Sequence, residues 1–229
     1  MLDYWKQHYK NHFCSHPKSP LQQVGKTVNG QVVNDYQLQL IASNIKASLL
    51  LDKVDCLADL GCGNGVLTSR LSEEAKCVKG FDFTEDLLNY AMEHHSAENI
   101  VYHCLDITRV DSKRLKEVDK LFMYEVLQHL SMIDFRQLLG QLERLRKNTP
   151  FFIGGIPDKE RIRRFYDTDE KYAYYQRCEK QAEPHLGRWW FETELSMVSE
   201  EFGWKLLRLN QPKDLYTSHY RFDALLVKK

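Results

Sequence analysis

Several features that mark special classes of protein are missing from this chain of 229 residues. Neither sign of charge is in excess, because 32 basic residues balance 32 acidic residues, and such a composition gives no general attraction to nucleic acid or to an acidic membrane surface. No apolar run approaches the length of a membrane span, and the first residues lack the apolar core and cleavage site of a signal peptide. We therefore expect a soluble, cytoplasmic protein whose partners include neither nucleic acid nor a membrane.

A cysteine pattern typical of metal sites or redox motifs is also missing. The six cysteines include no C-x-x-C pair. Four of them, Cys56, Cys62, Cys77 and Cys104, lie in or beside short apolar runs that are typical of buried strands. We therefore expect free thiols in a reducing compartment.

Histidines near the N-terminus do not complete a set of metal ligands. His8, His12 and His16 recur every four residues, and on one helix the first two would share a face. Pro17 disfavours helix at His16, and no carboxylate or cysteine completes the group. The aromatic side chains of residues 1–13 instead indicate a docking face. We expect no bound metal.

Three glycines at alternate positions are the most informative feature of the chain. Residues 56–65 read C-L-A-D-L-G-C-G-N-G, an apolar run followed by Gly61, Gly63 and Gly65. Without a Cβ, glycine lets the backbone turn sharply out of a strand and approach a ligand. The spacing is not the G-x-G-x-x-G of a dinucleotide fold, and Asp59 would repel a pyrophosphate. A ligand with a cationic amine and no phosphate fits better, and S-adenosylmethionine has that chemistry.

Strand-like and helix-like segments alternate along most of the chain, which predicts a parallel sheet with helices on both faces. Thr84 and Ser131 are the expected N-caps of two of the helices. The alternation breaks at residues 157–188, which are charged and rich in tyrosine. The expected strands are residues 55–60, 77–82, 100–105, 119–126, 151–156, 204–210 and 220–228, the last two pairing as a hairpin, and the expected helices are residues 35–52, 66–74, 84–95, 131–147 and 189–201.

These features together resemble the class I S-adenosylmethionine-dependent methyltransferases of the small-molecule type, whose first motif is acid-x-Gly-x-Gly-x-Gly. The resemblance implies an α/β, Rossmann-like fold: a seven-stranded, mostly parallel sheet with an antiparallel strand near the C-terminal end and helices on both faces. It implies one methyltransferase domain over residues 35–229, with a lid insertion at residues 157–188. Residues 1–34 are expected to form an N-terminal helix and a flap, the flap being residues 21–27.

The resemblance also assigns cofactor-binding residues. Asp82 follows Gly61 by 21 residues, the distance at which a strand–helix–strand unit brings an acid beside the glycine loop. Two alternatives stay open, since Asp106 could only cap the turn towards Thr108 and Phe83 could only pack in the core. By resemblance, the methionine portion of S-adenosylmethionine is held by Asp59 and the backbone of Gly61 and Gly63, the ribose by Asp82, and the adenine by Asp106, the backbone N–H of Ile107 and the face of Phe83, while Tyr124 and Glu125 line the methionine pocket.

His129 is the candidate catalytic residue. It lies just beyond the fourth strand, on the rim where the methyl group should face a substrate, and a histidine of near-neutral pKa can take a proton from an attacking hydroxyl or amine. The alternative is that His129 only packs on the helix that begins at Ser131. The basic residues of the lid could hold an anionic acceptor or form a solvated face; they are Lys159, Arg161, Arg163 and Arg164.

We expect an enzyme that transfers a methyl group from S-adenosylmethionine to an oxygen or nitrogen of a small-molecule acceptor, such as a sugar or secondary metabolite, and releases S-adenosylhomocysteine. A small acceptor is preferred because the lid is short and neither end carries a nucleic-acid or protein-docking module. The alternatives are a protein methyltransferase and a non-catalytic regulatory module that binds S-adenosylmethionine. The oligomeric state does not follow from the sequence.

Overall fold

The computed structural model of the chain describes residues 2–111, 113–183 and 185–229, and its main element is a seven-stranded sheet. Its strands are β3 (Cys56–Leu60), β4 (Cys77–Asp82), β5 (Ile100–Cys104), β6 (Lys120–Tyr124), β7 (Pro150–Pro157), β8 (Trp204–Leu209) and β9 (Arg221–Lys228). The helices along it are α3 (Asp35–Leu49), α4 (Val66–Ser72), α5 (Glu85–His94), α6 (Met132–Gln141) and α9 (Glu192–Glu201).

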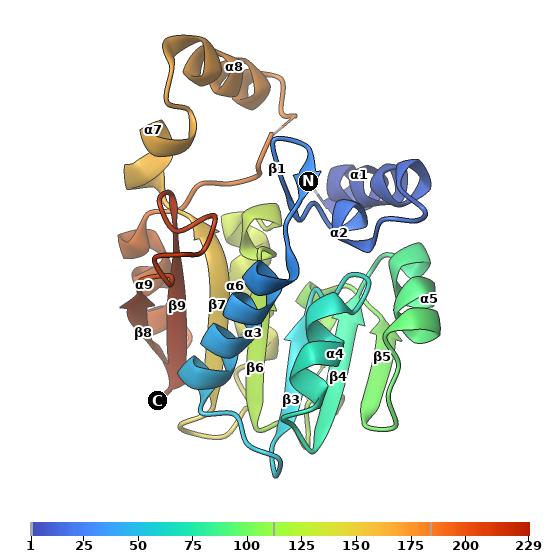
Figure 1. Cartoon of the computed structure of the whole chain (residues 1–229). Coiled ribbons are helices and arrows are strands. Elements are labelled where there is room, and N and C mark those ends of the chain that lie inside the picture. The colour runs from blue at the N-terminus through green and yellow to red at the C-terminus, as the bar shows by residue number, and fades with distance from the viewer. Residues whose placement is uncertain (1, 112, 184) are drawn as a thin grey trace.

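The strand order is β5-β4-β3-β6-β7-β9-β8. Strands β3 to β7 pair in parallel, and β9 lies antiparallel between β7 and β8. Figure 1 shows helices on both faces of this sheet. The predicted α/β fold is therefore confirmed, including the antiparallel strand near the C-terminal end.

The chain reverses its direction of travel across the sheet at β3. From β3 it moves outward to β4 and β5, and it then returns to β6 on the other side of β3. The connections therefore leave β3 and β6 on opposite faces, which opens a crevice at the carboxyl ends of these two strands.

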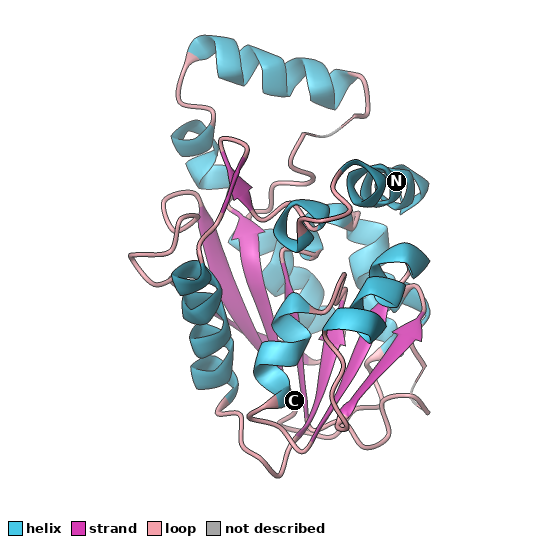
Figure 2. Ribbon diagram, turned by 45° about the vertical axis from the view of Figure 1, so that its right-hand side comes forward, coloured by secondary structure: helices cyan, strands magenta, loops and turns pink. Residues whose placement is uncertain are grey.

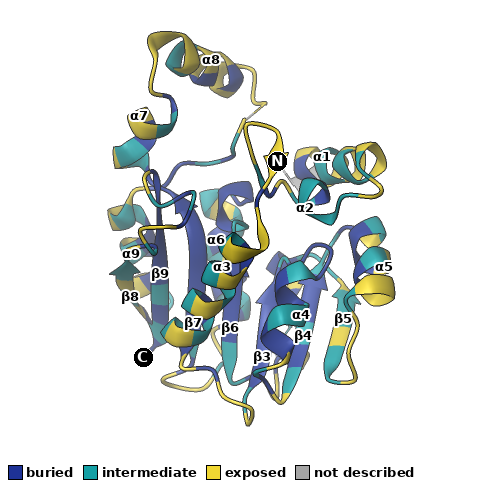
Figure 3. Cartoon of the chain, viewed as in Figure 1, coloured by how far each residue is buried: buried dark blue, intermediate teal, exposed yellow. Residues whose placement is uncertain are grey.

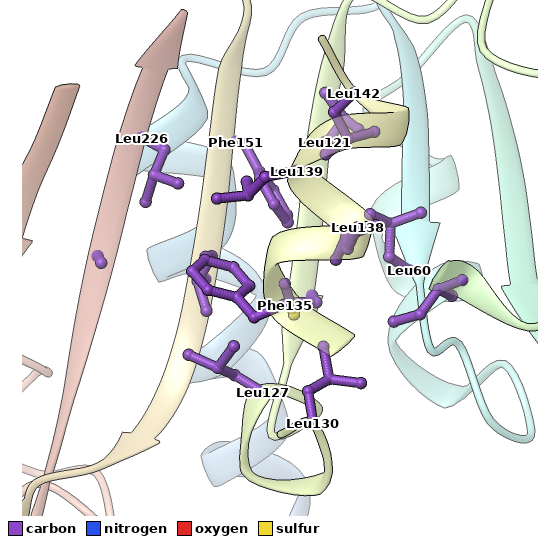
Figure 4. Packing of buried hydrophobic residues seen from close by; sticks show 14 of the residues in the cluster. Leu60, Leu121, Leu127, Leu130, Phe135, Leu138, Leu139, Leu142, Phe151 and Leu226 are labelled. Atoms are coloured by element: carbon purple, nitrogen blue, oxygen red, sulfur yellow. The ribbon is translucent and has the colours of Figure 1, made fainter. Parts of the chain in front are cut away.

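Two apolar layers hold the helices on the sheet. On one face, α6 and α9 contribute Phe135, Leu138 and Leu195 to the larger cluster, part of which Figure 4 shows. On the other face, α3 and α4 contribute Ile41 and Leu67. Figure 3 shows the consequence: the central strands are buried, whereas α3 exposes the side that faces away from the sheet. Among the described helices, none combines the length and the apolar character that crossing a bilayer requires.

Two further groups of helices lie beyond the carboxyl edge of the parallel strands (Figures 1 and 2). Before α3 come α1 (Leu2–Ser15), α2 (Pro20–Gln23) and a small hairpin of β1 (Thr27–Val28) and β2 (Gln31–Val32). Between β7 and α9 come α7 (Ile162–Phe165) and α8 (Asp169–Lys180). These segments coincide with the expected N-terminal region and lid insertion, whose roles as flap and lid stay predictions.

The expectation that the cysteines are free thiols was wrong for one pair. Cys56 and Cys77 begin the adjacent strands β3 and β4 and face each other in register, with their Cα atoms 4.7 Å apart. The structure joins them in a disulfide. Apolar patterning predicted both strands, but it carries no information on the register that aligns these two residues. The free cysteines of the described residues are Cys14, Cys62, Cys104 and Cys178.

Several helix ends differ from expectation by a few residues, and the contacts at α6 and α5 show how. Ser131 caps α6 as predicted, because its hydroxyl accepts the N–H of Asp134. The helix ends at Gln141 instead of residue 147, since the following backbone tightens into i→i+3 turns on its way to β7. Thr84 is the N-cap residue of α5, but its side chain makes no capping bond. Its backbone N–H instead donates to the Asp82 carboxylate at 2.8 Å.

Truncation of α6 on its buried face should destabilise the domain. Leu138 is fully buried in the larger cluster, whereas Ile133 on the same helix is 75% exposed. We predict that Leu138→Ala lowers the free energy of unfolding by about 2–5 kcal/mol, because it removes transfer free energy and leaves a cavity. Ile133→Ala should change it by less than about 0.5 kcal/mol. Urea titrations of both variants measure this, and equal losses would contradict the assignment of the core face.

Candidate functional site

A cavity of about 420 Å³ lies at the carboxyl ends of β3, β4 and β6. Asp59, Asp82 and Glu125 line it from these three strand ends. Trp5 of α1 and Lys26 of the flap also line it. The crevice expected from the topology is therefore covered by residues from the N-terminal segment.

The glycine loop turns directly out of β3 into the cavity. Gly61 and Gly63 both line it, and both have a positive φ, +88° and +53°. A Cβ on Gly61 would lie 2.5 Å from Cγ2 of Val126, so this position admits no side chain. The N–H of Gly63 donates to Asp82 Oδ2 at 2.9 Å. The sequence placed both glycines correctly at the cavity, although Gly61 is also required for packing against Val126.

Asp59 is a buried acid, and no cation among the described residues is in direct contact with it. Its side chain is 3% exposed, and Oδ2 accepts a hydrogen bond from the Thr68 hydroxyl at 2.6 Å. Burial raises the pKa of Asp59 to about 7, although the hydrogen bond from Thr68 opposes the shift. Asp59 is therefore poised to change its charge near neutral pH or when a cation binds beside it.

Asp82 and Asp106 both line the cavity, and both accept hydrogen bonds from the backbone. The Asp82 carboxylate accepts hydrogen bonds from the backbone N–H groups of Gly63 and Thr84. Burial raises the pKa of Asp82, and these hydrogen bonds oppose that increase. Asp106 Oδ1 accepts the N–H and hydroxyl of Thr108, so the turn-capping alternative describes a contact that the structure contains. Asp106 also lines the cavity, as do Phe83 and Ile107, and Phe83 lies outside the three apolar clusters of the described residues.

An ion pair joins the N-terminal segment to the end of β6 beside the cavity. Lys26 Nζ pairs with Glu125 Oε2, and the two side chains are 6% and 13% exposed. Burial alone would raise the pKa of Glu125, but the ammonium of Lys26 and the guanidinium of Arg221 outweigh it and lower that pKa. Glu125 has φ +58°, an unfavourable conformation for a side chain of this size. Such strain is often found at functional sites.

His129 lies in the single turn η2 (Leu127–His129) and lines the cavity. Its Nε2 hydrogen-bonds with the Tyr9 hydroxyl of α1 at 2.8 Å, and the Trp5 ring lies 4.1 Å from its own between centroids. Burial lowers the pKa of His129 to about 3, helped by His8 and Arg221. Its Nδ1 is buried without a hydrogen-bond partner among the described residues. The rim position thus agrees with the prediction, whereas these contacts of His129 are with α1 and not with the helix that begins at Ser131.

Other predicted residues divide between the cavity and the surface. Tyr124 lines the cavity, and its buried hydroxyl has no hydrogen-bond partner in the described part of the chain. Of the lid arginines, Arg161 pairs with Asp158 and Arg163 with Asp169. The described lining includes neither arginine, which agrees with the solvated-face alternative. Three other residues of the insertion reach the cavity: Phe165, His185 and Leu186.

The N-terminal histidines stack along α1 without forming a metal site. The rings of His8 and His12 lie 4.5 Å apart between centroids. No group of three histidine, cysteine or acidic residues with metal-binding geometry occurs in residues 2–111, 113–183 and 185–229. His8 and His12 instead line the cavity.

Three residues of the site were not assigned a role from the sequence: Lys26, Gln128 and Arg221. Lys26 is charged, whereas the other residues of the segment 21–27 are apolar or uncharged, and this charge was a weak signal of its role. Arg221 begins an apolar strand, where an unpaired charge is unusual, and this was the signal that could have identified it. Gln128 offered none.

Comparison with known proteins finds a family match for the central part of the chain. Residues 57–149 match the family described as "Methyltransferase domain". Over 108 residues the chain is 30% identical to the ubiquinone biosynthesis O-methyltransferase of Coxiella burnetii (strain RSA 493 / Nine Mile phase I), a match that covers 46% of this chain and 44% of the relative. It is 31% identical over 94 residues to the malonyl-[acyl-carrier protein] O-methyltransferase of Bacillus cereus, covering 40% and 31%. The chain thus spans less than half the length of these curated relatives.

Solved structures extend the similarity to nearly the whole fold. Magnesium protoporphyrin IX methyltransferase from Synechocystis PCC 6803, crystallised with S-adenosylhomocysteine, has a TM-score of 0.65 at 15% identity and covers 98% of this chain and 99% of its own. The N-methyltransferase NodS from Bradyrhizobium japonicum WM9, also with S-adenosylhomocysteine, has a TM-score of 0.62 at 15% identity, and the match covers 97% of each chain. The predicted resemblance to class I methyltransferases is confirmed as a similarity: residues 57–149 match the methyltransferase domain, and the fold matches structures that were crystallised with S-adenosylhomocysteine.

Protonation of Asp59 should make ligand binding depend on pH. With a pKa of about 7, Asp59 is increasingly neutral below that pH and loses its attraction for the ligand's ammonium group. We predict that S-adenosylhomocysteine binds more tightly as pH rises from about 5 to 7, by up to about tenfold per pH unit, and then levels off.

Calorimetric titration across this pH range tests the prediction. Asp59→Asn should bind weakly at every pH and show no rise, whereas Asp169→Asn, which alters a surface acid of α8 that is paired with Arg163, should behave like the wild type. A wild-type affinity that does not change with pH would remove Asp59 from the site.

Proposed function

Because residues 57–149 match a methyltransferase domain, we propose that this chain transfers a methyl group from S-adenosylmethionine to an oxygen or nitrogen of a small-molecule acceptor. The observation that carries the proposal is the convergence of three acids, Asp59, Asp82 and Asp106, on one cavity beside the glycine loop. Both curated relatives named above are O-methyltransferases, which favours oxygen over nitrogen.

The residues of the cavity fit S-adenosylmethionine. Asp59 is a buried carboxylate, and in the part of the chain that the structure describes its side chain accepts a hydrogen bond only from the neutral hydroxyl of Thr68, so a ligand cation would compensate its charge. We assign the methionine portion to Asp59 and the loop glycines, and the ribose hydroxyls to Asp82. Asp106 and the N–H of Ile107 would contact the adenine edge, and Phe83 its face. A side chain on Gly63 would lie 3.0 Å from Val24 Cγ1, and this narrow gap leaves room for backbone contact only.

When bound, S-adenosylmethionine supplies a methyl group that is already activated by its sulfonium. The chain therefore needs mainly to align the acceptor and to exclude water. The Lys26–Glu125 pair fastens the flap beside the site, and Trp5 and Tyr9 of α1 cover it. These contacts enclose the reacting atoms in a space that admits a small acceptor.

His129 is proposed to accept the proton that the acceptor loses. Its pKa of about 3 keeps the imidazole neutral at physiological pH, so a lone pair is always available. Such a low pKa also makes it a weak base. Its role therefore suits an acceptor whose proton becomes acidic as the new bond to carbon forms, with the Tyr9 hydroxyl fixing the ring through Nε2.

The proposed function is tested with S-adenosylmethionine that carries a trideuterated methyl group. The purified protein is added to a metabolite extract, and mass spectrometry searches for products that gain the labelled group while S-adenosylhomocysteine accumulates. We predict labelled small molecules with the wild type. Asp82→Ala should lose the labelling together with ten- to a hundred-fold of its affinity for S-adenosylhomocysteine, roughly the value of a lost hydrogen bond to a charge. Tight binding without any labelled product would support the non-catalytic module instead.

Replacement of His129 tests its role as the base. We predict that His129→Ala lowers turnover about 10²–10⁴-fold with little change in cofactor affinity. In the wild type, kcat should stay flat from about pH 5 to 8, because His129 is neutral above its pKa of about 3. Near-wild-type turnover of the variant would reject the role, and a rate that rises through pH 6.5 would point to another base.

A further inference from the structure

Arg221 is a buried cation at the acceptor end of the cavity. It begins β9 opposite Pro157, so it lies at the edge where β7 ends, beyond β6 and away from the glycine loop. It lines the cavity and is only 3% exposed. Its Nη1 donates to the side-chain oxygen of Gln128 and to the carbonyl oxygen of Gly155, whereas its Nε has no partner within residues 2–111, 113–183 and 185–229. A buried guanidinium with a free donor requires an explanation.

An irregularity in β7 holds this guanidinium in place. The pairing register with β9 shifts between Ile153 and Ile156, which is the pattern of a β-bulge. Within it, Gly155 has φ +69°, and a Cβ there would lie 2.6 Å from Cγ of Glu125. Its N–H donates to Asp223 Oδ1 at 2.8 Å while its carbonyl accepts from Arg221. The bulge therefore aims a backbone carbonyl at Arg221 and fixes the cation beside the cavity.

Further polar atoms without partners belong to residues that line the same cavity. They include Trp5 Nε1, which can only donate, and the hydroxyl of Tyr124. Contacts link Trp5 to Arg221, because the Trp5 ring packs on His129 and the Gln128 side chain lies between His129 and Arg221. A buried donor without a partner has lost its hydration and gained no hydrogen bond in return. A ligand group with several acceptor lone pairs on the Arg221 side of the cavity would supply the missing partners.

The acids near Arg221 are already engaged. Glu125 is paired with Lys26 and accepts from the Tyr216 hydroxyl at 3.3 Å. Asp223 accepts from Gly155, Gln211 and Asn44. Neither acid makes a hydrogen bond with Arg221 in the described residues. The acceptor end thus presents a cation and free donors, whereas the cofactor end presents acids.

Aromatic side chains form the walls around this cation. Phe165 and Tyr220 line the cavity with ring centroids 4.7 Å apart, and Trp5, Tyr9 and Tyr216 line it as well. Flat rings favour a flat, unsaturated guest, because stacked and edge-to-face arrangements add to the burial of apolar area. The cavity must hold the cofactor too, which limits the guest to a few rings.

From these contacts we infer that the acceptor is a planar aromatic carboxylic acid whose carboxylate is bound by Arg221, with the Trp5 N–H as a second donor. The inference rests on the proposed methyl transfer and names its substrate class. Arg221 is a specificity residue that anchors the acceptor, at a distance from the residues assigned to the cofactor.

The test measures binding of matched probes to the protein saturated with S-adenosylhomocysteine. The probes are aromatic acids of one to three rings (benzoate, 2-naphthoate and anthracene-2-carboxylate) and their neutral primary amides, followed by calorimetry or ligand-observed NMR. We expect at least one acid to bind more tightly than its amide by about tenfold or more. Acids that bind no better than their amides would overturn the inference. Failure of S-adenosylhomocysteine itself to bind would instead reject the proposed function.

Variants test whether Arg221 causes the preference for the acid over its amide. Arg221→Gln should weaken the acid about ten- to a hundred-fold, leaving the amide and S-adenosylhomocysteine unchanged. Arg208→Gln is the matched control, since that arginine lies on β8 and pairs with Asp158. If Arg221→Gln does not fold, Trp5→Phe serves in its place, because it keeps an aromatic ring and removes only the N–H; it should weaken the acid several-fold. An equal loss of S-adenosylhomocysteine affinity would assign Arg221 to the cofactor and contradict the inference.

Discussion

The ion pair between Lys26 and Glu125 is the contact on which the enclosed site depends. Both side chains are largely removed from water, and a buried charge that loses its partner costs about 3–5 kcal/mol. The pair ties the flap to the end of β6, although the two residues are 99 positions apart in sequence. It also secures a left-handed backbone at Glu125, a conformation that costs about 1–3 kcal/mol on its own.

Charge is arranged with opposite sign at the two ends of the cavity. Asp59, Asp82 and Asp106 lie on the side of the glycine loop, and Arg221 lies on the side of β7 and β9. A ligand with an amine and hydroxyls suits the first end, and an anionic group suits the second. This polarity would orient two reactants relative to each other before any chemistry occurs, which is the main task in transfer of an activated methyl group.

The side of the cavity at the glycine loop could be predicted from the sequence because its determinants are local. Each acid follows a short apolar run, and parallel strands bring their carboxyl ends to one edge, so Asp59 and Asp82 had to meet near the glycines. The sheet and most helix bounds followed from the same periodicity. The family match to residues 57–149 covers this local part.

The side of the cavity at Arg221 could not be predicted, because it depends on contacts between distant segments. Arg221 acquires its position from a bulge in β7, and Lys26 acquires its partner only when the flap folds over β6. The Cys56–Cys77 disulfide likewise requires the register of two strands. Burial also changes the acid–base chemistry expected of His129. Its position beyond the fourth strand suggested a base of near-neutral pKa, whereas burial lowers that pKa to about 3.

The most direct test of the central claim is a crystal structure of the protein with S-adenosylhomocysteine. The account predicts ribose hydroxyls at hydrogen-bond distance from the Asp82 carboxylate, the methionine amine beside Asp59, and the thioether sulfur facing His129. Density for the ligand outside this cavity, or a ribose with no contact to Asp82, would contradict it.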